Sequence, residues 1–223
     1  NSSISINRQI GSATSCKSTG DPHYLSSFGS KFSFQDEGFF TLFNSNHLAV
    51  QVYQKKFGAV SVNQAVAIRY GNEVYILDLR AQNATEKVKK VHGDGQNVIY
   101  TSPTKNAPMH HFRFSPCSST ITIKVNTWRY GSYLDITVNA AAFYSHSGIT
   151  GICGAKTAPT NLNSFAIPDS GNYFQNRFEN LNSDMKYKRV VSCKFPLPKD
   201  ACNSSGTSTT ASTTTSTSSI NSE

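Results

Sequence analysis

The chain has 223 residues, of which 37% are hydrophobic and 11% aromatic, so it can fold as one all-β domain or as two small domains with packed cores. Its formal net charge of +8 favours polyanionic neighbours: acidic polysaccharide, an anionic membrane surface or nucleic acid. The sequence has no zinc-finger spacing, RNA-recognition octapeptide or basic heptad region, and no run of 18 apolar residues, so we predict neither nucleic-acid binding nor a membrane span.

Short runs of alternating apolar and polar residues fill the body of the chain. They are rich in Val, Ile, Thr, Phe and Tyr, and in chain order they cover residues 31–34, 48–54, 60–62, 66–70, 74–79, 112–114, 121–125 and 133–138. Turn residues separate many of them, as at 70–72, 93–95 and 130–132. This pattern predicts an all-β fold, either an antiparallel sandwich or a barrel. Only residues 174–187 are compatible with a short helix.

The end of the chain has a different composition. Ser or Thr occupies 15 of the 21 residues of 203–223, and such a segment is too polar to offset the entropy of ordering its backbone. We expect a disordered, mucin-like tail that carries O-linked glycans, with an unmodified flexible linker as the alternative. Asn-x-Ser/Thr acceptors at Asn1, Asn83 and Asn203 also favour the secretory route.

Two motifs in the body resemble a known family. Residues 20–24 read Gly-Asp-Pro-His-Tyr and lead into the aromatic stretch Gly-Phe-Phe-Thr-Leu-Phe at 38–43, and Gly-Ile-Cys-Gly follows at 151–154. Their order and separation resemble the von Willebrand factor type D family. The resemblance is clearest over 16–165. We therefore expect a leader segment at 1–15, a β domain over 16–202 with a diverged extension at 166–202, and a linker at 203–223.

The resemblance implies a fold and a role. Members of the family are extracellular two-sheet antiparallel β-sandwiches that work in assembly, adhesion or shielding and are not by themselves catalytic. We accordingly expect a secreted, non-enzymatic structural or adhesive module on a glycosylated stalk, at a cell surface or in a cell wall. A Ser/Thr-rich tail on a basic β-domain fits a fungal wall protein. The expected partners are extracellular or cell-surface proteins, acidic polysaccharide, or a second copy of the chain.

The five cysteines leave at least one thiol without a partner. The resemblance implies a disulfide between Cys16 and Cys153. Proximity favours Cys193–Cys202 as a second bridge, which would leave Cys117 free. The alternative joins Cys117 to Cys193 or Cys202.

The resemblance also includes a calcium site, whose ligands are degraded here. Phe28 stands where members of the family usually have an Asp, and Ala-Lys-Thr-Ala at 155–158 replaces a second stretch of ligands. Only Asn161 and Asn163 remain as oxygen donors nearby, whereas calcium takes six to eight oxygens. We predict that the calcium site is absent or very weak, and we expect no other cofactor.

One peptide bond is a candidate for reaction. Asp-Pro bonds are acid-labile because the Asp carboxylate can attack its own carbonyl while proline leaves. In some members of the family the Gly-Asp-Pro-His bond cleaves itself, which would here involve Asp21, Pro22 and His23 as proton donor. The same motif is a structural turn in members that stay intact, and we expect an intact bond.

Two further functions stay open. A carbohydrate-binding module would present Trp128, Tyr130 and Tyr133 as an exposed cluster, and strict burial of Trp128 would argue against it. A secreted hydrolase would need a cleft with paired carboxylates, and the sequence offers only one half of an aspartic-protease signature, at 169–171. A histidine metal site is disfavoured because His110 and His111 are adjacent and would point to opposite faces of a strand.

Overall fold

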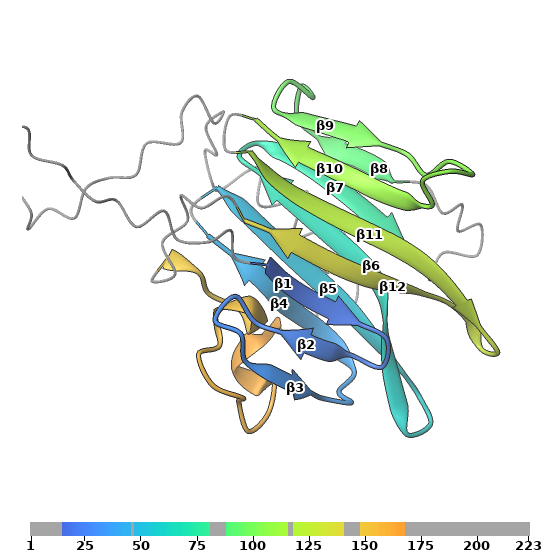
Figure 1. Ribbon diagram of the computed structural model, residues 1–223, viewed down its shortest axis with the longest axis vertical. Coiled ribbons are helices and arrows are strands. Elements are labelled where there is room, and N and C mark those ends of the chain that lie inside the picture. Colours follow the sequence, from blue (N-terminus) through green and yellow to red (C-terminus); the bar gives the residue numbers. More distant parts are fainter. Residues whose placement is uncertain (1–14, 46, 81–87, 116–117, 141–147, 168–223) are drawn as a thin grey trace, which may run out of the picture. The chain divides into compact units, whose positions relative to one another are not determined.

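The computed structural model describes residues 15–45, 47–80, 88–115, 118–140 and 148–167, which form two antiparallel β-sheets packed together (Figure 1). The all-β two-sheet sandwich predicted from the sequence is confirmed. The helix expected at 174–187, the extension beyond Ile167 and the Ser/Thr-rich tail lie outside the described residues, as does the leader segment up to residue 14.

The first sheet has seven strands. They are β1 (Ser15–Thr19), β2 (His23–Leu25), β3 (Lys31–Ser33), β9 (Val98–Thr101), β10 (Met109–Phe114), β11 (Ser119–Trp128) and β12 (Gly131–Asn139). Their spatial order is β3-β2-β1-β12-β11-β10-β9. Strict period-two alternation puts Ile121 and Ile123 of β11, and Leu134 and Ile136 of β12, into the core, while their neighbours face outward.

The second sheet has six strands. They are β4 (Gly38–Asn44), β5 (Leu48–Phe57), β6 (Val60–Tyr70), β7 (Glu73–Asp78), β8 (Lys89–His92) and β13 (Ala166–Ile167). Their order is β13-β4-β5-β6-β7-β8. The runs at 60–62 and 66–70 belong to the single strand β6. The pairing of β6 with β5 shifts register between Tyr53 and Gln54, and Gln64 is left without a partner. This β-bulge accommodates the polar residues between the two apolar runs, so the strand continues through them.

The main core lies between the sheets. Large side chains with almost no exposure fill it, among them Phe43, Leu48, Ile68, Phe112, Phe114, Ile121 and Leu134. A second apolar cluster lies on the other face of the six-stranded sheet and contains Phe39, Ala65, Ala67, Val74, Ile76 and Ile167. The central strands β6 and β7 are therefore buried on both faces.

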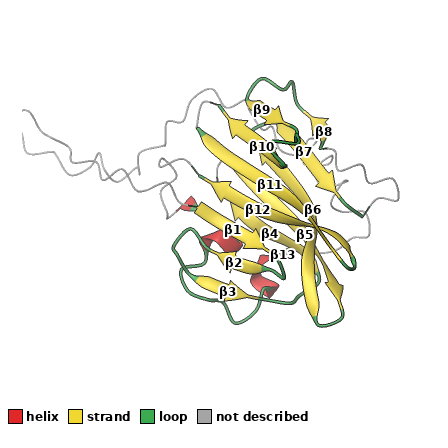
Figure 2. Ribbon diagram, turned by 45° about the vertical axis from the view of Figure 1, so that its right-hand side comes forward, coloured by secondary structure: helices red, strands yellow, loops and turns green. Residues whose placement is uncertain are grey.

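Helical structure in the described part of the chain amounts to short 3-10 turns after β12, including η2 (Ile152–Gly154) and η3 (Asn163–Phe165), which pack near β4 (Figure 2). No helix in that part is long and apolar enough to cross a membrane.

Candidate functional site

A disulfide joins the two motifs that carry the family resemblance. Cys16 on β1 is bonded to Cys153 in η2, as the resemblance implies, and closes a separation of 137 residues. Ser27, just after β2, adds a backbone hydrogen bond to the carbonyl of Cys153, 2.9 Å from N to O. The bridge therefore ties the first strand of the seven-stranded sheet to the segment that packs on β4 of the six-stranded sheet.

The glycines on either side of Cys153 are sterically required. A Cβ at Gly151, whose φ is +81°, would lie 2.7 Å from the carbonyl oxygen of Thr41, and one at Gly154 would lie 2.5 Å from that of Ile149. Backbone therefore packs directly on backbone at both positions. The Gly-x-Cys-Gly pattern is explained by this close approach and by the bridge, and it needs no catalytic role.

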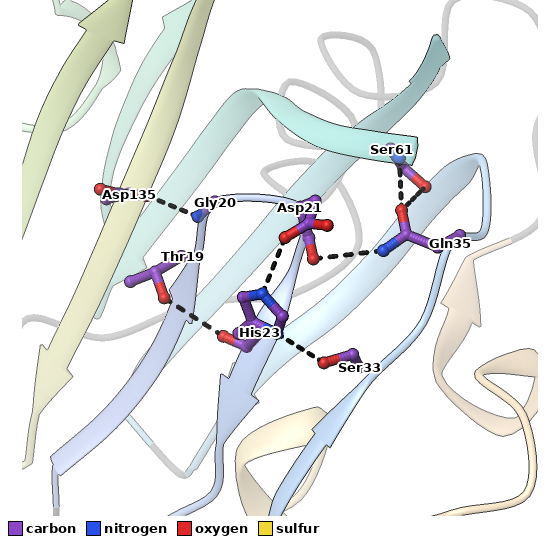
Figure 3. A network of polar contacts seen from close by, with 8 residues as sticks. All are labelled: Thr19, Gly20, Asp21, His23, Ser33, Gln35, Ser61 and Asp135. Atoms are coloured by element: carbon purple, nitrogen blue, oxygen red, sulfur yellow. Dashed lines mark hydrogen bonds and ion pairs between the residues drawn. The ribbon is translucent and has the colours of Figure 1, made fainter. Parts of the chain in front are cut away.

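The Gly-Asp-Pro-His turn connects β1 to β2 and is held by contacts from both sheets (Figure 3). The N–H of Gly20 donates to Asp135 on β12 over 2.8 Å. The side-chain amide of Gln35 donates to the carbonyl oxygen of Asp21 over 3.2 Å, and its own oxygen accepts from the N–H of Ser61 on β6. The turn is thus a clasp between the sheets.

Both ring nitrogens of the histidine of the motif contact polar neighbours, one in the turn and one on β3. His23 Nε2 lies 2.8 Å from the Asp21 carboxylate, and His23 Nδ1 lies 2.7 Å from the Ser33 hydroxyl on β3. Cleavage of the Asp21–Pro22 bond would require the carboxylate to attack the Asp21 carbonyl carbon and the proline nitrogen to take up a proton. Gln35 already supplies a donor to that carbonyl oxygen, but neither ring nitrogen of His23 is free to protonate Pro22. This arrangement favours a structural turn.

The residues of the expected calcium site are brought together only in part. The Lys156 ammonium lies 5.8 Å from the centre of the Phe28 ring, and the Ser30 hydroxyl donates to the Lys156 carbonyl. The side chain of Asn161 accepts a hydrogen bond from the N–H of Asn163, 3.0 Å away. A cation and an aromatic ring therefore lie where the family resemblance implies oxygen ligands, and the weakness of calcium binding stays a prediction.

The adjacent histidines of β10 face opposite sides of the sheet, as predicted. His110 is fully buried beside Tyr100, whose hydroxyl lies 2.8 Å from His110 Nδ1, and burial lowers the pKa of His110. His111 is on the outer face. No group of three His, Cys, Asp or Glu side chains within the described residues is arranged to hold a metal ion.

Four aromatic side chains gather where the ends of two hairpins meet, one from each sheet. We call this set, Phe57, Trp128, Tyr130 and Tyr133, the tip cluster. Trp128 is at its centre, with ring centroids 5.8 Å from Phe57, 5.0 Å from Tyr130 and 6.2 Å from Tyr133. The Phe57 and Tyr130 rings are nearly parallel, 6.3 Å apart. The clustering expected of Trp128, Tyr130 and Tyr133 is therefore present.

The tip cluster is partly open to solvent and bordered by cations. Tyr130 is 51% exposed, Trp128 is of intermediate exposure, and the Trp128 indole N–H finds no acceptor within the described residues. The Arg129 guanidinium lies 4.6 Å from the Tyr130 ring centre, and the Lys55 ammonium lies 5.3 Å from the Phe57 ring centre. Packing the hairpins together accounts for Phe57 and Trp128, but it does not account for the exposed ring of Tyr130.

Several predicted residues lie outside the described part of the chain. They are Asn1, Asn83 and Asn203 of the glycosylation sites, Cys117, Cys193 and Cys202, and the partial protease signature at 169–171.

No protein-family model matches the chain, and no curated protein matches it.

Proposed function

We propose that this chain is a non-enzymatic, extracellular adhesive module of the von Willebrand type D kind. The observation that carries the proposal is the Cys16–Cys153 disulfide, because it joins the strand before Gly-Asp-Pro-His to the cysteine of Gly-Ile-Cys-Gly. Structural disulfides persist in oxidising compartments, which favours secretion or display at a cell surface or wall. The expected partners are extracellular or cell-surface proteins, acidic polysaccharide, or a second copy of the chain.

The glycosylated stalk belongs to the same proposal. O-linked glycans on 203–223 would stiffen that segment and hold the β domain away from its anchor, and N-linked glycans at Asn1, Asn83 and Asn203 would accompany secretion.

The test is non-reducing peptide mapping by mass spectrometry of the full chain secreted from a eukaryotic host. We expect one peptide pair linked through Cys16 and Cys153, and glycans on the Ser/Thr-rich tail. Reduced, unlinked Cys16 and Cys153 in folded, secreted protein would remove the main support for the family and for the extracellular assignment.

A second candidate function is carbohydrate or polyanion binding. The tip cluster favours it, because an exposed tyrosine beside a partly exposed tryptophan presents ring faces on which a sugar can stack, with Lys55 and Arg129 alongside. A secreted hydrolase ranks below both, since neither the clasped turn nor the tip cluster presents paired carboxylates. The Tyr130→Ala variant tests the second candidate, since it removes an exposed ring without opening the core, and binding of glycan arrays should fall.

A further inference from the structure

The outer face of the seven-stranded sheet is polar and exposed. This face consists of the outward side chains of β1–β3 and β9–β12. It carries threonines at Thr101, Thr120, Thr122 and Thr137 and cations at Lys17, Lys31, Arg113 and Lys124. All four cations are exposed, whereas the corresponding face of β6 and β7 on the other sheet carries the buried apolar residues Ala65, Ala67, Val74 and Ile76.

The cations are placed in a regular way by the strand register. Leu25 is paired with both Lys31 and Lys17, so these two lysines stand in one row across β3, β2 and β1. Lys17 is paired with Thr137, and Thr137 with Thr122, two residues before Lys124 on β11. Lysines thus recur on every second strand, at β3, β1 and β11. Since neighbouring strands are about 4.8 Å apart, these three lysines are separated by roughly 10 Å across the sheet, and Arg113 lies on β10, next to β11.

Within the described residues these cations form no ion pair with a carboxylate, although Lys124 stands directly opposite Asp135 in the register of β11 and β12. Asp135 is the one carboxylate on the described strands of this face, and it accepts hydrogen bonds from the N–H of Gly20 over 2.8 Å and from the Asn126 amide over 2.7 Å. Lys17, Lys31, Arg113 and Lys124 take part in no ion pair there. The face therefore has positive charge available for an external anion.

The same face is continuous with the tip cluster. Tyr133 is the cross-strand partner of Asn126, and both side chains alternate with core residues, so Tyr133 lies on the outer face just beyond Lys124. Trp128 follows on β11 and contacts Tyr133. One surface thus combines aromatic rings at one end, hydroxyl groups along its length, lysines on alternate strands and Arg113 on β10.

We propose that this outer face binds an acidic polysaccharide laid across the strands from β3 towards the tip cluster. The inference rests on the carbohydrate- or polyanion-binding candidate and names its surface and its ligand class. Sugar rings stack on Trp128 and Tyr130, threonine hydroxyls bond the sugar hydroxyls, and the lysines pair with the acid groups.

The spacing of the cations selects a polysaccharide rather than a nucleic acid. A glycan with one carboxylate per disaccharide carries its charges at about the interval of the lysines, because two linked pyranose rings extend for roughly two strand spacings. Phosphates in a nucleic acid follow one another more closely, at about 3.4 Å per strand along a duplex. The face also lacks the dense arginine and lysine rows of a phosphate-tracking groove.

The test measures binding of hyaluronate, which has one carboxylate per disaccharide, to the full glycosylated chain by calorimetry at low and physiological salt. Neutral dextran and single-stranded DNA are the comparison probes. The face variant is Lys17→Gln/Lys124→Gln, and the matched control is Lys89→Gln/Lys90→Gln, which removes the same charge from exposed lysines of β8 on the other sheet.

We expect hyaluronate binding to weaken about tenfold in the face variant and to change little in the β8 control. Equal weakening in both variants, no hyaluronate binding by the natural sequence, or tighter binding of single-stranded DNA would overturn the proposal. A third outcome is that hyaluronate and dextran bind equally and that only Tyr130→Ala weakens their binding. This result would support carbohydrate binding by the tip cluster and would exclude a preference for acidic polysaccharide. Thermal melting of each variant shows whether the fold is retained.

Discussion

The two sheets share one core but differ in their outer faces. On β11 and β12 of the seven-stranded sheet, outward residues such as Thr122 and Thr137 are polar and partly exposed between buried neighbours. On β6 and β7 of the six-stranded sheet, the outward Ala65, Ala67 and Val74 are almost completely buried. A strand with one solvated face shows its burial as a period of two, whereas a strand buried on both faces reads as a continuous apolar run.

This difference separates the roles of the two sheets. A face that is apolar and already buried has no surface for an external ligand, and its contribution is stability. The polar face costs little to keep in water and can present charge and aromatic rings. The proposed binding surface therefore lies mainly on the seven-stranded sheet, and a set of substitutions should affect the two sheets differently.

Removing the bridge between the sheets should have the largest effect. In the chain-entropy model, a disulfide that closes 137 residues contributes about 5 kcal/mol, a large part of the stability of a domain. We expect Cys16→Ala/Cys153→Ala to lower the free energy of unfolding by an amount of that order, measured by urea unfolding of secreted protein. Natural-sequence protein under reducing conditions is the control and should match the variant. A loss below about 1 kcal/mol would show that the packing of η2 on β4 holds the sheets together without the bridge.

A matched pair of substitutions tests the difference between the outer faces directly. Ala67→Asp places a carboxylate on the buried face of β6 and should destabilise by about 3 kcal/mol or more, because the charge is taken out of water and the larger side chain overfills a position with no exposed area. Thr122→Asp makes the same change on the polar face of β11 and should cost less than about 1 kcal/mol. Chemical unfolding of both variants gives the comparison. Similar costs at the two positions would contradict the assignment of one face to stability and the other to solvent.

The sequence predicts β11 and β12 of the seven-stranded sheet well, but it predicts poorly the strand β1, which precedes the Gly-Asp-Pro-His motif. The runs at 121–125 and 133–138 are strictly alternating, and both are strands. By contrast, β1 places Cys16 and Ser18 inward, and a serine gives no apolar signal. Ser18 is buried because the side-chain amide of Asn63, on the other sheet, donates to its hydroxyl over 2.8 Å. A contact between residues so far apart in the sequence leaves no local pattern.

The residues of the candidate site also fall into two groups, those that the sequence could relate to one another and those that only the fold brings together. Trp128, Tyr130 and Tyr133 belong to one hairpin, so their clustering could be predicted from the turn between them. Phe57 comes from a hairpin of the other sheet, and no spacing in the sequence relates it to Trp128. The lysines of the outer face were equally hidden, because Lys31, Lys17 and Lys124 come into register only through the pairing of β3, β2, β1, β12 and β11.

A buried histidine should make stability depend on pH. Burial lowers the pKa of His110 in the folded protein, whereas in the unfolded chain its pKa is near the ordinary value of about 6.5. As the pH falls below that value, the unfolded chain takes up the proton first, so the contribution of neutral His110 to stability is lost in acid. Urea unfolding between pH 7.5 and pH 5 should show a smaller loss of stability for His110→Phe than for the natural sequence. His111→Gln, on the outer face, should follow the natural sequence, and an unchanged slope in His110→Phe would contradict the prediction.

The smallest expected effect is at the Asp21–Pro22 bond, which we expect to survive days at pH 5. The carbonyl of Asp21 accepts a hydrogen bond from Gln35, which would favour attack by the carboxylate. However, the ring nitrogens of His23 are engaged by Asp21 and Ser33, so His23 is not free to give a proton to the departing proline.

The measurement needs two forms of the sample, because the Cys16–Cys153 bridge would keep residues 1–21 attached after cleavage. Hydrolysis would then appear as the gain of one water in the intact mass, and as two separate fragments after reduction. Ser33→Ala is the informative variant, since it frees one nitrogen of His23 while the contact with Asp21 remains. An unchanged mass in both proteins would agree with a structural role for the turn and would exclude self-cleavage at pH 5. Cleavage confined to Ser33→Ala would show that the contact with the Ser33 hydroxyl prevents His23 from assisting cleavage of the Asp21–Pro22 bond. Cleavage of the natural sequence would show that this bond is reactive in the folded protein.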